Sequence, residues 1–222
     1  MKKNLTEIVF ILDRSGSMSG LEADTIGGYN SLIAKQKKEE GEAYVSTVLF
    51  DDEITVLHDR VDLEKVEPMT DREYYVQGCT ALLDAVGGAI HHIGNVHKYA
   101  RQEDVPEKTL FIITTDGMEN SSKRYTYEKV KKMVERQKEK FGWEFLFLGA
   151  NIDAVKEAGR FGIKPERAVR YECDREGTAV NYKVLNQTIS MVRSCAPCMM
   201  EEALDAGNWK EEIEADYKKR HK

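Results

Sequence analysis

The stretch FILDRSGSMSGLEAD, residues 10–24, carries the strongest indication of the fold. Its apolar start ends at Asp13, and Ser15, Ser17 and Ser19 follow at every second position before a charged, helix-like segment. In a loop that remains extended, alternate side chains point the same way, so Asp13, Ser15 and Ser17 would place one carboxylate and two hydroxyls on one side. The stretch therefore predicts a buried strand that ends in an oxygen-rich loop.

Short apolar segments elsewhere in the chain, rich in β-branched or aromatic residues, predict further strands. The predicted strands cover 7–13, 43–50, 109–116 and 144–150. Between them, apolar residues at spacings of three and four predict helices. These helices cover 22–40, 80–100 and 126–141. Strands that alternate with helices in this way predict an α/β fold, with parallel strands and helices on both faces of the sheet.

Two further regions complete the predicted sheet. The segment FDDEITVL, 50–57, joins two strand-like runs through a tight acidic turn, and it predicts a hairpin that adds one antiparallel edge strand. Farther along, the pattern predicts a short helix over 153–162, a last strand over 168–173 and a long amphipathic helix over 177–195. The strands and helices thus extend close to the end of the chain.

A charged tail follows. We predict one domain over 1–198 and an amphipathic tail over 199–222, in which Trp209, Ile213 and Tyr217 recur at four-residue spacing. Such a stripe docks either on its own domain or on a partner. Docking on its own domain is favoured, because an exposed Trp stripe would otherwise be a liability.

Composition argues against several classes of function. The 222 residues include 33 Lys and Arg against 39 Asp and Glu, a net charge of −6, so no global basic field favours nucleic acid or a membrane as partner. The apolar run near the N-terminus covers only 8–12, too short for a signal peptide or a membrane span. Four scattered cysteines are too few for a disulfide framework. These features predict a cytoplasmic protein and leave its oligomeric state open.

Two short motifs are interpreted as structural. CAPC, 195–198, is a C-x-x-C without the second Cys/His pair that a zinc site needs. In HHIGNVH, 91–97, the side chains of His91 and His92 point in different directions on a helix. Solvent-facing histidines are therefore favoured over a metal cluster.

Two carboxylates are expected at one edge of the sheet. Asp13 ends the first strand and Asp116 ends the strand in IITTDGMEN, and the carboxyl ends of parallel strands form the binding edge of such sheets. Thr80, in QGCTALLDA, offers a further hydroxyl or, alternatively, an N-cap. Ser19 pairs with Glu22 in the S-x-x-E pattern of a capping box and is explained without function. The remaining oxygen ligands suit Mg²⁺ and other hard divalent cations.

The D-x-S-x-S of Asp13, Ser15 and Ser17, followed by Thr80 and then by Asp116 in TTDG, resembles the metal-ion-dependent adhesion site of von Willebrand factor type A (vWA) domains. The resemblance extends over roughly the first 150 to 190 residues, including the predicted hairpin, and does not reach the tail. It implies a doubly wound, mostly parallel sheet of six strands with one antiparallel edge strand. The stand-alone intracellular members of the family are the most similar type.

The resemblance also implies a role for each residue of the site. The hydroxyls of Ser15, Ser17 and Thr80 would approach Mg²⁺ or Mn²⁺, and Asp13 and Asp116 would act directly or through water. The cation would then accept a Glu or Asp side chain from a partner protein, as it does in family members. The implied function is a non-enzymatic, metal-dependent protein-binding module.

An enzyme is the alternative. Asp13 and Asp116 could hold Mg²⁺ for phosphoryl transfer or for hydrolysis of a phosphate ester. Such hydrolysis needs a poised water and a general base, and the sequence near these loops offers no obvious His or Lys for that role. An aspartyl-phosphate enzyme would also want a second acid two residues after its nucleophile, where Ser15 stands. The sequence therefore favours the binding module.

Overall fold

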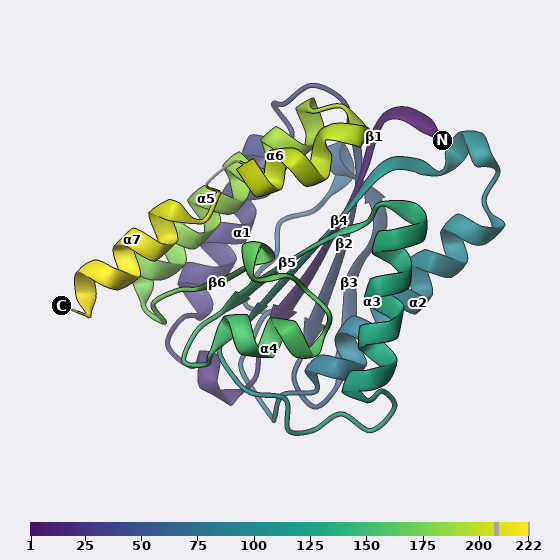
Figure 1. The fold of residues 1–222 in the computed structure, drawn as a ribbon. Coiled ribbons are helices and arrows are strands. Elements are labelled where there is room, and N and C mark those ends of the chain that lie inside the picture. The colour runs from purple at the N-terminus through teal and green to yellow at the C-terminus, as the bar shows by residue number, and fades with distance from the viewer. Residues whose placement is uncertain (207–208, 222) are drawn as a thin grey trace.

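The computed structural model describes residues 1–206 and 209–221, which contain a six-stranded sheet covered by helices on both faces (Figure 1). The strands are β1 (Lys2–Asp13), β2 (Glu42–Phe50), β3 (Ile54–Asp62), β4 (Pro106–Thr115), β5 (Glu144–Gly149) and β6 (Ala168–Arg170). Their order in the sheet is β3-β2-β1-β4-β5-β6, and only the pairing of β3 with β2 is antiparallel among these strands. The predicted fold class is confirmed.

Seven α-helices cover the sheet in the described part of the chain. They are α1 (Glu22–Gln36), α2 (Leu82–Tyr99), α3 (Tyr127–Phe141), α4 (Ala154–Arg160), α5 (Arg175–Ser194), α6 (Met200–Ala206) and α7 (Glu211–Arg220). In Figure 1, α1, α5, α6 and α7 lie on one side of the sheet and α2, α3 and α4 on the other. Each helix predicted from apolar spacing is present, with bounds that differ by a few residues.

Strand β1 is central because its side chains are buried on both faces. Ile8 and Phe10 pack in the core beneath α1 and α5, whereas Val9 and Ile11 pack in the core beneath α2 and α3. Both β2 and β4 pair with it in parallel. A strand covered on both faces gains hydrophobic stabilisation from every residue, which explains why its sequence is apolar without alternation.

The predicted capping box at Ser19 is wrong. Residues Gly16–Met18 form a 3-10 turn, and Gly20, with a φ of +91°, redirects the chain before α1 begins. The N-cap is Leu21, which has no side-chain capping bond, and Glu22 accepts a hydrogen bond from the Gly20 N–H instead. Ser19 ends the 3-10 turn and Gly20 has a positive φ, so the segment from Ser19 to Glu22 lacks the geometry that a capping box requires.

The C-terminal tail packs on the rest of the chain. Trp209 and Ile213 belong to the core beneath α1 and α5, and the Trp209 indole N–H donates to the carbonyl of Glu166 at 2.9 Å. Arg167, which is 1% exposed, pairs with Glu144 of β5 and with Asp205 of α6. Docking of the stripe on its own domain is thus observed. The division of domain and tail at residue 198 remains a prediction.

Replacing Ile213 by alanine should lower the free energy of unfolding by about 2–5 kcal/mol, because it empties a fully buried site. Urea unfolding would measure the change. Lys219→Ala, at an exposed position on the same helix, is the control and should stay within about 0.5 kcal/mol of wild type. Equal effects of the two substitutions would contradict the packing of the tail.

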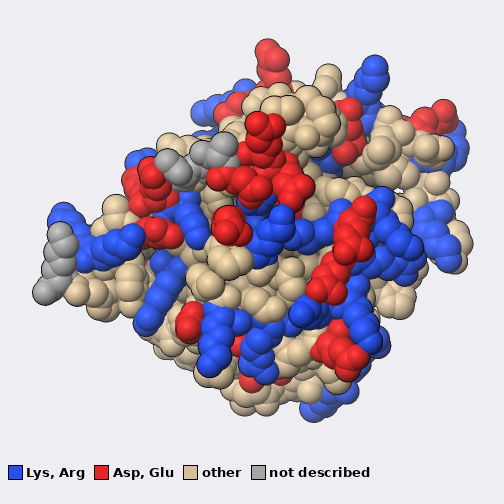
Figure 2. Space-filling view, viewed as in Figure 1, with Lys and Arg blue, Asp and Glu red and all other residues tan. Residues whose placement is uncertain are grey.

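Charged side chains of both signs are mixed on one face of the molecule. Lys and Arg are interspersed with Asp and Glu on the face shown in Figure 2. No helix in the described residues is both long and apolar enough to cross a membrane.

Candidate metal centre

The predicted site lies where the sheet connections diverge. Asp13 is the last residue of β1, and Asp116 follows β4, which pairs directly with β1. From β1 the chain continues to α1 on one face, and from β4 it continues to α3 on the other. Loops that leave adjacent strands toward opposite faces open a crevice at the carboxyl edge of the sheet, where ligands of such folds bind. The two carboxylates are neighbours, as predicted.

A chain of hydrogen bonds joins the side chains of three separate segments. Thr80 Oγ1 donates to Ser15 Oγ at 3.1 Å, and the hydroxyls of Ser15 and Ser17 are 3.1 Å apart. Ser17 Oγ donates to Asp116 Oδ1 at 2.5 Å. Asp13 Oδ1 accepts the backbone N–H of Ser15 at 2.7 Å. The structure therefore brings all five predicted residues together.

Asp13 is held from two directions by residues that sequence reasoning missed. Thr115 Oγ1 donates to Asp13 Oδ2 at 2.6 Å, and the Tyr74 hydroxyl donates to the Asp13 carbonyl oxygen at 2.5 Å. Thr115 directly precedes Asp116 in the TTDG motif, which is the only sequence signal for it. Tyr74 stands in a loop, 61 residues from Asp13, and its position follows from the tertiary structure alone.

Burial sets the electrostatics of the two carboxylates. It raises the pKa of Asp13 to about 6, although hydrogen bonds from Thr115 and Ser15 act in the opposite direction. Burial also raises the pKa of Asp116, against a hydrogen bond from the Ser17 hydroxyl. Ionising a buried carboxylate is costly without a nearby positive charge. A cation bound between the two would relieve that cost.

The arginine that follows Asp13 along the chain forms its ion pair with a different carboxylate. Arg14 and Asp51 are both buried and form an ion pair at 2.8 Å. The same guanidinium donates to Thr55 Oγ1 of β3 and to the carbonyl of Glu73. Arg14 thus connects the first loop to the β2–β3 hairpin and to the loop that carries Tyr74. Its charge is balanced locally by Asp51.

The Thr80 loop is fixed against the loop after β4. The Thr80 N–H donates to Asn120 Oδ1 at 2.9 Å, and the Asn120 N–H donates to the Thr80 carbonyl at 3.1 Å. Between these loops, a Cβ on Gly117 would lie 3.1 Å from Thr80 Oγ1 and 3.3 Å from Ser17 Oγ. The alternative that Thr80 is an N-cap is wrong, because α2 begins at Leu82 and its N-cap is Ala81.

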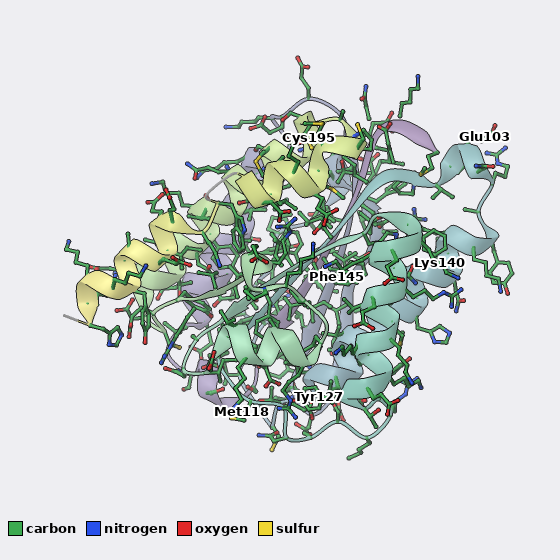
Figure 3. The ribbon with its side chains drawn as sticks, viewed as in Figure 1. Glu103, Met118, Tyr127, Lys140, Phe145 and Cys195 are labelled. Carbon is green, nitrogen blue, oxygen red and sulfur yellow. The ribbon has the colours of Figure 1, made fainter. Side chains whose placement is uncertain are left out.

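One sulfur also reaches the site. Cys173, which follows β6, places its thiol 3.7 Å from Asp116 Oδ2 as a hydrogen-bond donor. The only sequence signal for this contact is that Cys173 ends the predicted strand 168–173, whereas β6 ends at Arg170. Cys195 lies at the end of the molecule opposite Met118, which stands in the loop after β4 (Figure 3). The CAPC motif is therefore remote from the site, and all four cysteines are free thiols.

The prediction that the histidines of HHIGNVH face solvent is wrong for one of the three. His91 and His92 are exposed, as expected. His97 is not solvent-facing: it is half-buried, and its Nε2 lies 3.3 Å from the buried carboxylate of Glu7.

The described residues hold no cluster of three or more His, Cys, Asp or Glu side chains that could bind a metal. The oxygen cluster of two carboxylates and three hydroxyls is a donor set that suits a hard divalent cation.

The strand order, the antiparallel edge strand and the loops that leave β1 and β4 toward opposite faces are those of the von Willebrand factor type A fold, and known structures show the same fold. The chain is similar to the vWF domain of the type V pili tip protein Mfa5 from Porphyromonas gingivalis, with a TM-score of 0.60 and 11% identity over 86% of this chain and 96% of that one. No protein-family model and no curated protein matches the sequence.

Two further structures share the fold. Proximal thread matrix protein 1 from the mussel byssus, solved with a zinc-occupied MIDAS motif, has a TM-score of 0.56 and 16% identity over 83% of this chain and 46% of that one. A von Willebrand factor type A protein from Catenulispora acidiphila has a TM-score of 0.54 and 13% identity over 84% of this chain and 42% of that one. This chain spans less than half of both. At such identities the likeness establishes the fold alone.

Proposed function

We propose that this chain is a metal-dependent protein-binding module whose Mg²⁺ or Mn²⁺ accepts a Glu or Asp side chain from a partner protein. Asp13, Ser15, Ser17, Thr80 and Asp116 would hold the cation. The observation that carries the proposal is the hydrogen-bonded chain of hydroxyls that ends on a buried carboxylate, assembled from three separate segments. The zinc-occupied MIDAS motif of the mussel protein adds support, since that protein shares the fold.

The donor set explains why a bound cation would still attract a partner. Three of the five proposed ligands are neutral hydroxyls. The Asp13 carboxylate accepts hydrogen bonds from the Ser15 N–H and the Thr115 hydroxyl. The Asp116 carboxylate accepts hydrogen bonds from the Ser17 hydroxyl and the Cys173 thiol. Carboxylates that already accept hydrogen bonds neutralise a cation less completely. A hard cation in this setting would retain affinity for one more carboxylate.

The same geometry favours binding over hydrolysis. Hydrolysis at a metal site needs a base that can take a proton from water. Arg14, the charged side chain beside Asp13 along the chain, is committed to Asp51. An assay with a generic phosphate ester in Mg²⁺ separates the two functions, and turnover that Asp13→Asn abolishes would support the enzyme.

We place the module in the cytoplasm, where four free thiols would stay reduced.

Ser15→Ala should weaken Mg²⁺ or Mn²⁺ binding roughly 10-fold, because it removes one neutral ligand and interrupts the hydroxyl chain. Isothermal titration calorimetry measures the affinity. Ser19→Ala is the matched control, since Ser19 is an exposed serine of the same loop and makes no side-chain bond in this chain of hydroxyls. Unchanged affinity in Ser15→Ala would contradict the assignment.

Partner binding is tested with the full chain as bait for proteins of its native host. Capture should require divalent cation, should disappear in EDTA and should return when excess Mg²⁺ is added. It should also be weaker with Ser15→Ala and unchanged with Ser19→Ala. Capture that is indifferent to EDTA would overturn the proposed function, whatever the metal affinity.

A further inference from the structure

A concave site lies at the edge of the sheet opposite the candidate metal centre. It is a groove of about 700 Å³ between the later turns of α2 and α3, beside the start of β4. In Figure 3, Lys140 of α3 marks this end of the molecule, and Met118 marks the end with the metal centre. The groove shares no residue with the five proposed metal ligands. Its volume lies within the range of about 300–1,000 Å³ that is typical of small-molecule sites.

The floor of the groove is apolar. Ile90 and Trp143 line it and are buried in the adjoining core, where the Trp143 ring stacks on Phe111 at a centroid distance of 5.3 Å. Phe141 also lines the groove and leaves 59% of its surface exposed. An exposed phenyl ring next to a rigid indole gives an apolar ligand a contact surface that the fold does not itself cover.

A glycine forms part of the wall of the groove on α2. Gly94 lies within α2, where a glycine weakens the helix relative to alanine. A Cβ at this position would lie 3.1 Å from Gln137 Nε2 and 4.0 Å from the Trp143 ring. The glycine therefore allows the side chains of Gln137 and Trp143 to approach the backbone of α2 closely. A larger residue at Gly94 would occupy the space that a ligand would use.

The rim of the groove is cationic. Lys98, Arg136 and Lys140 line it, against one carboxylate, that of Glu107. Glu107 already accepts the backbone N–H of Asn4 at 3.0 Å. Arg136 and Lys140 are one helical turn apart on α3, and within the described ranges neither has an acidic side chain within 4.0 Å. Two unpaired cations beside an apolar floor match an anionic head group attached to an apolar body.

We propose that this groove binds a small amphiphilic carboxylate, with its apolar chain or ring on Trp143 and Phe141 and its carboxylate between Arg136 and Lys140. Guanidinium and ammonium groups provide charge-assisted hydrogen bonds to a carboxylate. The floor offers the remaining atoms of such a ligand an apolar contact. This site is independent of the proposed metal function, so its occupancy does not require a divalent cation.

The test is calorimetric titration of the full chain with decanoate, below its micelle concentration and in the presence of EDTA. Wild type should bind with a sub-millimolar dissociation constant. Gly94→Leu should weaken binding about 10-fold or more by filling the groove, and so should the double variant Arg136→Gln/Lys140→Gln by removing the two cations. The double variant changes exposed side chains only, so it tests the site even where Gly94→Leu does not fold.

Two controls distinguish binding in the groove from nonspecific binding to a charged or apolar surface. Lys131→Gln/Lys132→Gln removes the same charge from exposed positions of α3 outside the groove, and it should bind decanoate like wild type. Decyltrimethylammonium, which has the same chain and the opposite charge, should not bind detectably. Equal binding of the two amphiphiles, equal loss in both double variants, or full binding by folded Gly94→Leu would each overturn the proposal.

Discussion

Asp116→Ala is expected to weaken Mg²⁺ or Mn²⁺ binding about 100-fold or more, equivalent to about 3 kcal/mol, while the protein remains folded. The substitution removes one of two carboxylates in the site, and that carboxylate is also the acceptor for the Ser17 hydroxyl. Asp13→Ala should have an effect of similar size on metal affinity. Both exceed the effect expected for Ser15→Ala, because each removes a negative charge rather than a neutral ligand.

Without bound metal, loss of the Asp116 carboxylate should not reduce the thermal stability of the protein. Asp13 and Asp116 are both buried, and the charge of Asp116 contributes to the raised pKa of Asp13. Without a cation their repulsion destabilises the fold, so Asp116→Ala should not lower the melting temperature in EDTA. Asp71→Ala, which removes an exposed carboxylate from the neighbouring loop, is the control for metal affinity. Affinity in Asp116→Ala within twofold of wild type would contradict the proposed site.

The stability of the metal-free protein should fall as pH rises through the pKa of Asp13. That pKa is about 6 in the folded protein, compared with 3.8 for an ordinary Asp, so the folded state favours the protonated carboxyl. The resulting stabilisation is complete below pH 3.8 and is lost as pH rises past 6. A shift of this size corresponds to about 3 kcal/mol. The raised pKa of Asp116 acts in the same direction.

Urea unfolding in EDTA between pH 4 and pH 7.5 measures this effect as the difference between wild type and Asp13→Asn. The amide keeps the shape of the carboxylate and does not titrate, so the difference isolates Asp13 from other groups. Asp13→Asn should be the more stable of the two at pH 7. With metal present the order should reverse, because the cation needs the ionised carboxylate. Parallel pH profiles for the two proteins would rule out the raised pKa.

Local patterns were enough to predict the sheet and its helices. The continuous apolar residues of 7–13 and 109–116 indicated strands buried on both faces, and β1 and β4 are the adjacent central strands. The acidic turn at 51–53 indicated the antiparallel edge, because too few residues separate the two runs for a crossover helix. These signals are reliable because side-chain periodicity depends on the backbone of each element alone.

The site was predictable only in part. Asp13 and Asp116 were found because each follows an apolar strand, and the positions of parallel strand ends follow from the topology. Tyr74, Asn120 and Cys173 were missed, because their positions along the chain do not show which residues of the other loops they contact. Their contacts arise where loops from different parts of the chain meet.

The order and type of the strands and helices could be predicted from the chain alone, since these depend on interactions between near neighbours, whereas the residues at which α1 and β6 end differ from the predicted ones. Which polar groups share a buried environment depends on how distant segments pack together. Glu7 and His97 are 90 residues apart and in contact, and Ser19, whose pattern suggested a cap, lies after a turn that prevents one. Burial raises the pKa of Asp13 because three distant segments exclude water from it together, and no local pattern encodes their approach.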